Sequence, residues 1–295
     1  MPRRNWIVLF VCLIGCAITV VPAIAQSNTG IDWQEGPSVG SLGQIAQINI
    51  PSGYRFAGKV GAQKVLELTQ NPVDGSELGV IVPEDKDNFW YAIFDFAQVG
   101  YVKDTEKDSL DKGAILDSIE KATEESNKTR QARGWTPFHV SGWVTPPFYD
   151  PATNNLTWAV SGYAQDPKVG REESINYSVR ILGRQGTMNV DLVVSPERSS
   201  VAMPEFESLL RGFSFLPGNR YADFRAGDEV AKYGLTGLIL GGAVAVAAKT
   251  GLLAKFWKLL VLIAAAILGA IKKFLRLLKK VFTGKAAEEE QVSMK

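Results

Sequence analysis

Two alternating segments, residues 175–182 and 187–194, constrain the fold more than any other feature of this chain of 295 residues. Only four residues separate the segments, and glycine begins and ends that connection. Folding the chain about the connection places Val179 opposite Val190 on an apolar side, whereas Arg180 lies on a mostly polar side. The pattern predicts an antiparallel hairpin that buries one face and exposes the other to solvent.

The middle of the chain, residues 26–225, combines further strand patterns with helical ones. Apolar residues spaced by three and four predict one long helix over 110–133. Asp108 or Ser109 is expected to cap its start, and Gly134 follows its end. The expected apolar face of this helix consists of Ile115, Ile119, Ala122 and Ser126. Other strands are expected at 44–50, 78–82, 89–96, 138–149, 156–164 and 213–215, and short helices at 61–70 and 204–211. The mixture indicates an α+β domain that is rich in antiparallel strands.

A basic and apolar leader precedes this domain. Two arginines come before an uncharged run over 6–21, and Ala-Ile-Ala at 23–25 supplies the small residues of a cleavage site. This order is typical of a secretory signal peptide, which we predict over residues 1–25. An uncleaved anchor is one alternative, and lipidation at Cys16 is another. Both cysteines of the chain lie in the leader, so cleavage would leave no disulfide, no thiolate nucleophile and no cysteine-based zinc site.

Apolar and basic segments after the domain predict a membrane anchor over residues 226–282, followed by a polar tail over 283–295. The anchor contains an uncharged run at 235–248 and a longer apolar stretch at 252–271. A basic amphipathic helix at 272–282 would suit an anionic membrane surface.

The segments are compatible with either one or two membrane crossings. The basic residues of the tail favour one full crossing with the tail in the cytoplasm. Gly237 and Gly241 have the spacing of close helix packing, which would suit either a two-span hairpin or a homo-oligomer. A soluble helical hairpin is a further alternative.

The charge distribution agrees with an anchored domain on the outer side of a membrane. The formal net charge is only +1, which argues against a general nucleic-acid binder. Residues 26–225 carry 19 basic and 26 acidic residues, whereas residues 226–295 carry 11 basic and 5 acidic ones. We therefore expect a lipid bilayer as partner and the soluble domain on the periplasmic side of the inner membrane.

Residue patterns that carry chemistry are scarce. His139 is the only histidine of the chain, and a structural role suits it better than a catalytic one. No phosphate-binding loop, dinucleotide fingerprint or calcium loop is present, and the sequence predicts no catalytic, cofactor-binding or metal-binding residue. The glycine-bounded turn at 183–186 suits a hairpin turn better than an anion site. The candidates for a ligand or partner surface are Arg180, Arg184, Asn154, Asn155, Asp150 and Asp223.

Uncommon strings along the chain resemble a bacterial family. They are Asn71-Pro72, Gly100-Tyr101-Val102, Arg133-Gly134-Trp135, Gly142-Trp143, Tyr149-Asp150, Thr153 to Ala159, Asn176-Tyr177, Arg180 to Gly183 with Arg184 and Gly186, Tyr221 to Arg225, Gly227-Asp228, Ala231 and Tyr233-Gly234-Leu235. Over roughly residues 40–250 the chain is similar to predicted membrane-anchored proteins with the domain of unknown function numbered 2167. The resemblance implies a membrane-anchored bacterial protein, and it transfers no catalytic residue.

Three functions are compatible with these features. The leading hypothesis is a non-catalytic envelope module that binds a protein or an envelope component. The second hypothesis is an envelope hydrolase that uses acidic residues such as Asp150 or Asp223. The third hypothesis is a subunit of a transport or stress-sensing assembly. A pocket with two paired carboxylates, one of raised pKa, would favour the hydrolase. An exposed aromatic face without such a pair would favour binding.

Overall fold

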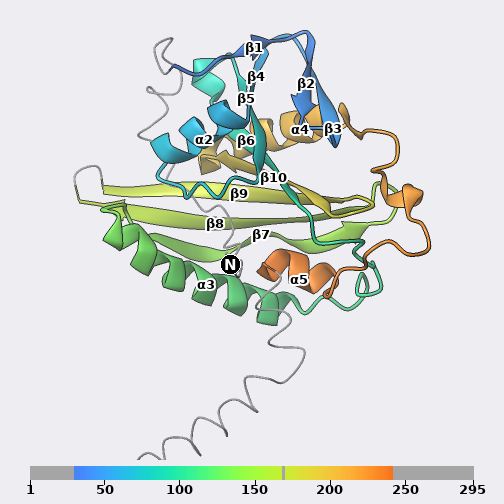
Figure 1. Ribbon diagram of the computed structural model, residues 1–295. Helices are drawn as coiled ribbons and strands as arrows, with labels where there is room; N and C mark the ends of the chain where they lie inside the picture. Colours follow the sequence, from blue (N-terminus) through green and yellow to red (C-terminus); the bar gives the residue numbers. More distant parts are fainter. Residues whose placement is uncertain (1–29, 168–169, 242–295) are drawn as a thin grey trace, which may run out of the picture. The chain divides into compact units, whose positions relative to one another are not determined.

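The computed structural model describes residues 30–167 and 170–241, which belong to one compact unit (Figure 1). The predicted signal peptide at 1–25, with Cys16, lies outside the described residues. The apolar segments beyond residue 241 and the tail at 283–295 also lie outside them. These assignments stay predictions.

The described chain forms two antiparallel sheets and several helices, which confirms the α+β class. The large sheet has the order β1 (Gln34–Glu35), β4 (Tyr54–Gly58), β5 (Glu77–Pro83), β6 (Tyr91–Ala97), β10 (Thr187–Val194), β9 (Gly170–Leu182), β8 (Asn155–Asp166) and β7 (Phe138–Asp150). The small sheet has the order β11 (Phe213–Phe215), β3 (Ala46–Ile50) and β2 (Ser38–Leu42). The helices are α2 (Lys59–Leu68), α3 (Lys112–Ala132), α4 (Ser199–Leu210) and α5 (Leu235–Leu240), with short 3₁₀ turns η1 (Lys86–Asn88), η2 (Pro196–Arg198) and η3 (Tyr221–Asp223).

Elements cover both faces of the large sheet. On one face, α2 packs against β5 and β6, while α3 and α5 pack against β7 and β8. On the other face, α4 and the small sheet enclose the largest apolar cluster, which includes Leu42, Ile48, Phe206, Val190 and Leu192. Each layer therefore buries one apolar side of its own strands or helices against the central sheet.

The hairpin of β9 and β10 has the predicted register. Val179 pairs with Val190, Arg180 pairs with Asn189, and the N–H of Gly183 donates to the carbonyl of Gly186 in the turn (2.8 Å). The expectation of a solvent-exposed polar face is wrong, however, because Arg180 and Asn189 are buried. This face lies between the parts of the sheet that α2 and α3 cover, and its polar side chains form hydrogen bonds with one another, Arg180 with Asp191 and Asn189 with Asp95.

Helix α3 lies within the predicted range, but its cap and its buried face differ from the prediction. Asp111, and not Asp108 or Ser109, is the N-cap, because its side chain accepts a hydrogen bond from the N–H of Ala114 (3.0 Å). Gly134 has the left-handed φ of 72° expected after the helix.

The buried face of α3 keeps Ile115 and Ile119 but continues through Thr123 and Asn127 in place of Ala122 and Ser126. The side chain of Asn127 accepts from the N–H of Phe138 (2.9 Å) and donates to its carbonyl (2.7 Å). These two hydrogen bonds tie the helix to the first residue of β7 and explain why a polar residue is buried there.

Replacing Asp111 with alanine should lower the free energy of unfolding by about 0.5–2 kcal/mol, because the first turn of α3 loses its side-chain cap. Urea denaturation of the purified protein measures this change. Asp108→Ala is the matched control and should have a smaller effect, since the cap belongs to Asp111. Equal losses in both variants would contradict the assignment of the cap.

The start of the predicted anchor segment is part of the folded domain. Leu235, Leu238 and Ile239 of α5 are buried in the cluster that also contains Ile115 of α3. Gly237 lies against the ring of Tyr233, and Gly241 ends α5 with a φ of 72°. Within 30–167 and 170–241, no helix combines the length and hydropathy that a membrane crossing requires.

Candidate functional site

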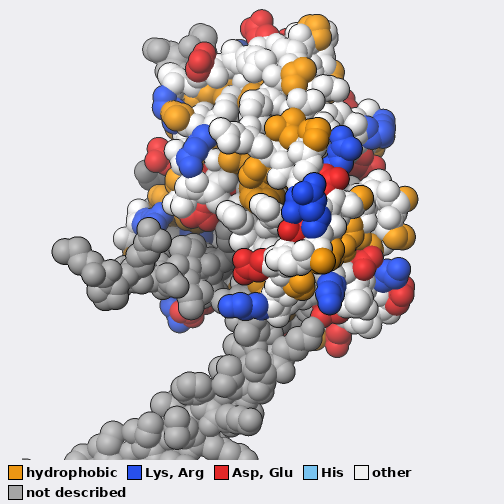
Figure 2. Space-filling view, turned by 45° about the vertical axis from the view of Figure 1, so that its right-hand side comes forward, with side chains coloured by type: hydrophobic (Ala, Val, Ile, Leu, Met, Phe, Trp, Pro, Cys, Tyr) orange, Lys and Arg blue, Asp and Glu red, His pale blue; other side chains and the backbone are white. Residues whose placement is uncertain are grey.

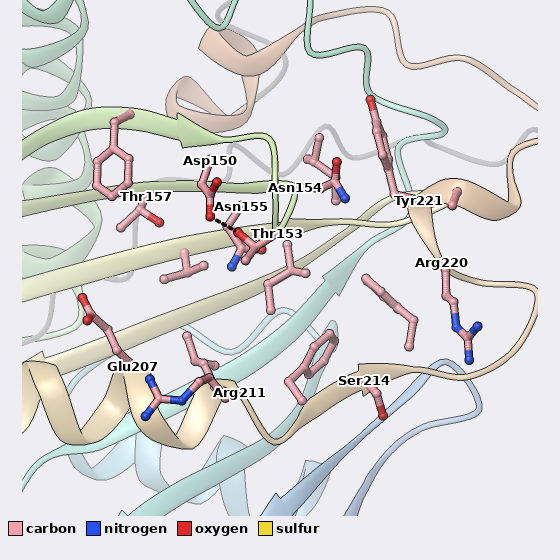
Figure 3. A pocket seen from close by; sticks show the side chains of 18 of the residues that line it. Asp150, Thr153, Asn154, Asn155, Thr157, Glu207, Arg211, Ser214, Arg220 and Tyr221 are labelled. Atoms are coloured by element: carbon pink, nitrogen blue, oxygen red, sulfur yellow. Dashed lines mark hydrogen bonds between the residues drawn. The ribbon is translucent and has the colours of Figure 1, made fainter.

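A groove with a volume of about 910 Å³ lies between the large sheet and the segment from α4 to η3 (Figure 3). Its floor is formed mainly by the side chains of Tyr177, Val179 and Ile181 of β9. One wall is the end of β7 and the turn to β8, and the other is formed by α4, β11 and η3.

The walls of the groove add exposed groups to this apolar floor. Phe148 of β7 leaves 46% of its surface exposed. Glu207 and Arg211 lie at the end of α4, and Arg220 precedes η3 (Figure 3). Figure 2 shows the molecule with the right-hand side of Figure 1 turned toward the viewer. On this surface, hydrophobic side chains lie among basic and acidic ones. An apolar floor with polar groups at its edges is the usual composition of a ligand site.

Three of the predicted site residues line the groove: Asp150 ends β7, Asn154 lies in the turn that follows, and Asn155 begins β8. Asn154 adopts a positive φ of 57°, and its side chain accepts from the hydroxyl of Tyr149 (3.2 Å). The side-chain oxygen of Asn155 is buried, and among residues 30–167 and 170–241 it has no hydrogen-bond partner. Asp150 accepts from the hydroxyl of Thr153 (2.7 Å), and this hydrogen bond lowers the pKa of the Asp150 carboxyl.

The other three predicted site residues do not line the groove, and their side chains make contacts within the fold. Arg184 forms a bidentate ion pair with Asp228, with both distances 2.7 Å, and these hydrogen bonds lower the pKa of Asp228 to about 2. Asp223 accepts from the N–H groups of Gly218 (2.9 Å) and Arg220 (3.0 Å). These contacts fix the loop that follows β11.

Arg180, the third of these residues, belongs to a buried polar network on the opposite face of the sheet. Its guanidinium donates to Asp191 (3.0 Å) and lies 4.8 Å from the ring centroid of Trp158. In the same network, the amide of Asn189 donates to Asp95 (2.7 Å).

Burial raises the pKa of Asp95 to about 8, and the nearby Asp191 carboxylate adds to this rise. Asp95 and Asp191 form the kind of carboxylate pair that would favour a hydrolase. Neither side chain lines the groove, however, and both are buried under the helical face of the sheet. The pair is therefore part of the core, and substrate in the groove would not reach it.

His139 lies at the surface, where its Nδ1 is 2.7 Å from a carboxylate oxygen of Glu124. Across residues 30–167 and 170–241, no group of three or more His, Cys, Asp or Glu side chains could hold a metal ion.

One hydrogen-bonded pair at the groove, Tyr177 and Glu207, was not predicted from the sequence. The hydroxyl of Tyr177 donates to Glu207 (2.7 Å), and burial together with this carboxylate raises the pKa of Tyr177. The two residues are 30 positions apart in β9 and α4, and no spacing in the sequence links them. The sequence shows that residue 177 is aromatic, but the position of Tyr177 on the floor of the groove depends on how α4 crosses the sheet.

The fold and the groove define a class of protein, an α+β domain whose antiparallel sheet carries a ligand-sized groove on one face. The chain belongs to the family described as protein of unknown function (DUF2167), which matches residues 34–272. This match confirms the resemblance seen in the sequence. A comparison with curated proteins finds no match.

Several solved structures are distantly similar to the chain. The cyanobacterial PsbP of Synechocystis sp. PCC 6803 has 11% identity and a TM-score of 0.36, covering 61% of this chain and 94% of that one. The Ran-binding protein Mog1p of Saccharomyces cerevisiae has 12% identity and a TM-score of 0.32, with 66% and 99% covered. LpqN of Mycobacterium tuberculosis, involved in cell envelope biogenesis, has 11% identity and a TM-score of 0.30, with 64% and 92% covered. These TM-scores carry no conclusion about function.

Proposed function

We propose that the protein is a non-catalytic binding module that holds a partner in the groove over β9. The observation that supports this proposal is the composition of the groove, in which buried Tyr177, Val179 and Ile181 form the floor and exposed polar groups form the edges. A partner in this groove would bury exposed apolar area such as the ring of Phe148, which favours binding, and the polar groups at the edges would select that partner.

A hydrolase in the groove fits the same residues less well. A general acid needs a carboxyl of raised pKa, whereas the hydrogen bonds around Asp150 lower its pKa. Asp223 has its carboxylate engaged by two backbone N–H groups of the loop. Both carboxylates thus hold turns in place, which favours binding over acid catalysis.

We further propose that this module is anchored in the inner membrane with its domain on the periplasmic side. The support for this placement is the sequence pattern alone, which combines the leader at 1–25 with the apolar and basic segments that continue beyond residue 241. The partners would then be the lipid bilayer and an envelope protein.

Site-specific photo-crosslinking in cells tests the groove assignment. Benzoylphenylalanine in place of Phe148 should give a discrete product after irradiation, because this exposed ring forms part of the groove wall. The matched control carries the same group at Val60 of α2, which is 65% exposed and does not line the groove. Products from Val60 alone, or from both positions in equal amount, would contradict binding in the groove.

A further inference from the structure

The edge of the small sheet carries backbone groups that no part of the described chain uses. One edge of β11 pairs with β3, and alternate residues of β11 take part in this pairing. The N–H of Asn49 donates to the carbonyl of Gly212 (3.0 Å), and the N–H of Leu216 donates to the carbonyl of Ile45 (2.8 Å). In an antiparallel pair the residues between these positions turn their N–H and C=O groups to the other edge. Phe213 and Phe215 are these residues, and within 30–167 and 170–241 their backbone groups have no hydrogen-bond partner.

This open edge borders the groove. β11 is an outer strand of the small sheet, and all three of its residues line the groove. The small sheet packs over β4 and β5 of the large sheet, whereas the groove extends over β9, β8 and the end of β7. The sheet-on-sheet packing therefore stops at β11, and the groove occupies the place that a next strand would take (Figure 3).

The chemistry of the groove specifies what kind of strand would fit. Its floor has no charged side chain, and the charges of Asp150 and Glu207 on its walls balance those of Arg211 and Arg220. A complementary segment is uncharged and presents apolar side chains to the floor at every second position. The backbone groups of such a segment would pair with those of Phe213 and Phe215.

We propose that the groove binds an extended, uncharged polypeptide segment of a partner protein, which adds a fourth strand to the small sheet along β11. This inference rests on the proposed function, and it names the class of partner and the mode of binding. Unpaired strand edges are templates for this kind of addition, and the backbone pairing supplies affinity while alternate side chains supply specificity.

A pair of variants at one position isolates the backbone contribution. Phe213→Ala removes the ring and keeps the N–H, whereas Phe213→Pro removes both, and proline is tolerated at a strand edge that pairs with nothing. The probe is a phage-displayed library of random heptapeptides, selected on the full chain in detergent micelles. We expect enrichment of uncharged heptapeptides with alternating apolar residues. Their affinity for Phe213→Pro should be at least about tenfold weaker than for Phe213→Ala.

Hydrogen exchange of the wild-type chain provides a second readout that does not depend on the folding of a variant. Adding an enriched heptapeptide should protect the amides of Phe213 and Phe215, while Ser214 is already paired with β3. Equal affinity for the two variants, enrichment of charged peptides, no enrichment, or no added protection would each overturn strand addition. If crosslinking from Phe148 still succeeds in such a case, the groove assignment stands, and if crosslinking also fails, the proposed function fails with it.

Discussion

Replacing Asp191 with alanine should lower the free energy of unfolding by about 3–5 kcal/mol, because it breaks the buried ion pair between Asp191 and Arg180. The side chains of Arg180 and Asp191 are each only 5% exposed. Asp191 also accepts a hydrogen bond from the hydroxyl of Ser178, which would lose its acceptor. Chemical denaturation at neutral pH measures the change.

The exposed ion pair of Arg171 and Glu173 on the same strand is the matched control. Its side chains are 48% and 54% exposed, so Glu173→Ala should cost less than about 1 kcal/mol. Replacing Arg180 and Asp191 together, with methionine and leucine, should recover much of the loss because apolar side chains then take the place of both charges of the pair. A small effect of Asp191→Ala, similar to that of Glu173→Ala, would show that water solvates the network.

The free energy of unfolding should fall as the pH rises from about 4 to about 8. Asp95 has an ordinary pKa of 3.8 in the unfolded chain and a pKa of about 8 in the fold. Between these values the unfolded chain loses its proton while the folded chain keeps it, so rising pH favours unfolding. The stability from this group is therefore complete below pH 4 and is lost by the time the pH passes 8.

Asp95→Asn should flatten this part of the pH profile, because an amide does not titrate. Urea denaturation at several pH values between 4 and 8.5 provides the comparison with the wild-type chain. Asp150→Asn serves as control, since the pKa of Asp150 is lowered and its contribution is lost as the pH falls. An unchanged decline in Asp95→Asn would show that another group causes it.

The elements that local patterns define could be predicted from the sequence. The register of β9 and β10 followed from strict alternation about a short turn, because a slip of one residue would reverse both faces. The strands β5 and β6 and the long helix α3 followed in the same way from apolar spacing between turn residues. In each case the interacting residues are close in the sequence.

Features that depend on distant segments could not be predicted. Asp95 and Asn189 share a hydrogen bond across 94 positions, so no local spacing identifies the buried network. Helix α4 begins at Ser199, five residues before the predicted start at Pro204, because η2 leads directly into it. For the groove, the sequence identified the polar turn at 150–155, but not the floor that α4 and β11 leave open.

The position of α5 late in the chain has a consequence for the order in which the domain can fold during synthesis. The N–H of Thr236 donates to the carboxylate of Glu106, made 130 residues earlier, and Leu235 and Leu238 fill the cluster beneath α3. A growing chain that has reached residue 225 already contains every strand of both sheets, yet it still lacks these side chains. Shortened products that end there would display an unfinished apolar surface, which is the kind of surface that chaperones and proteases recognise.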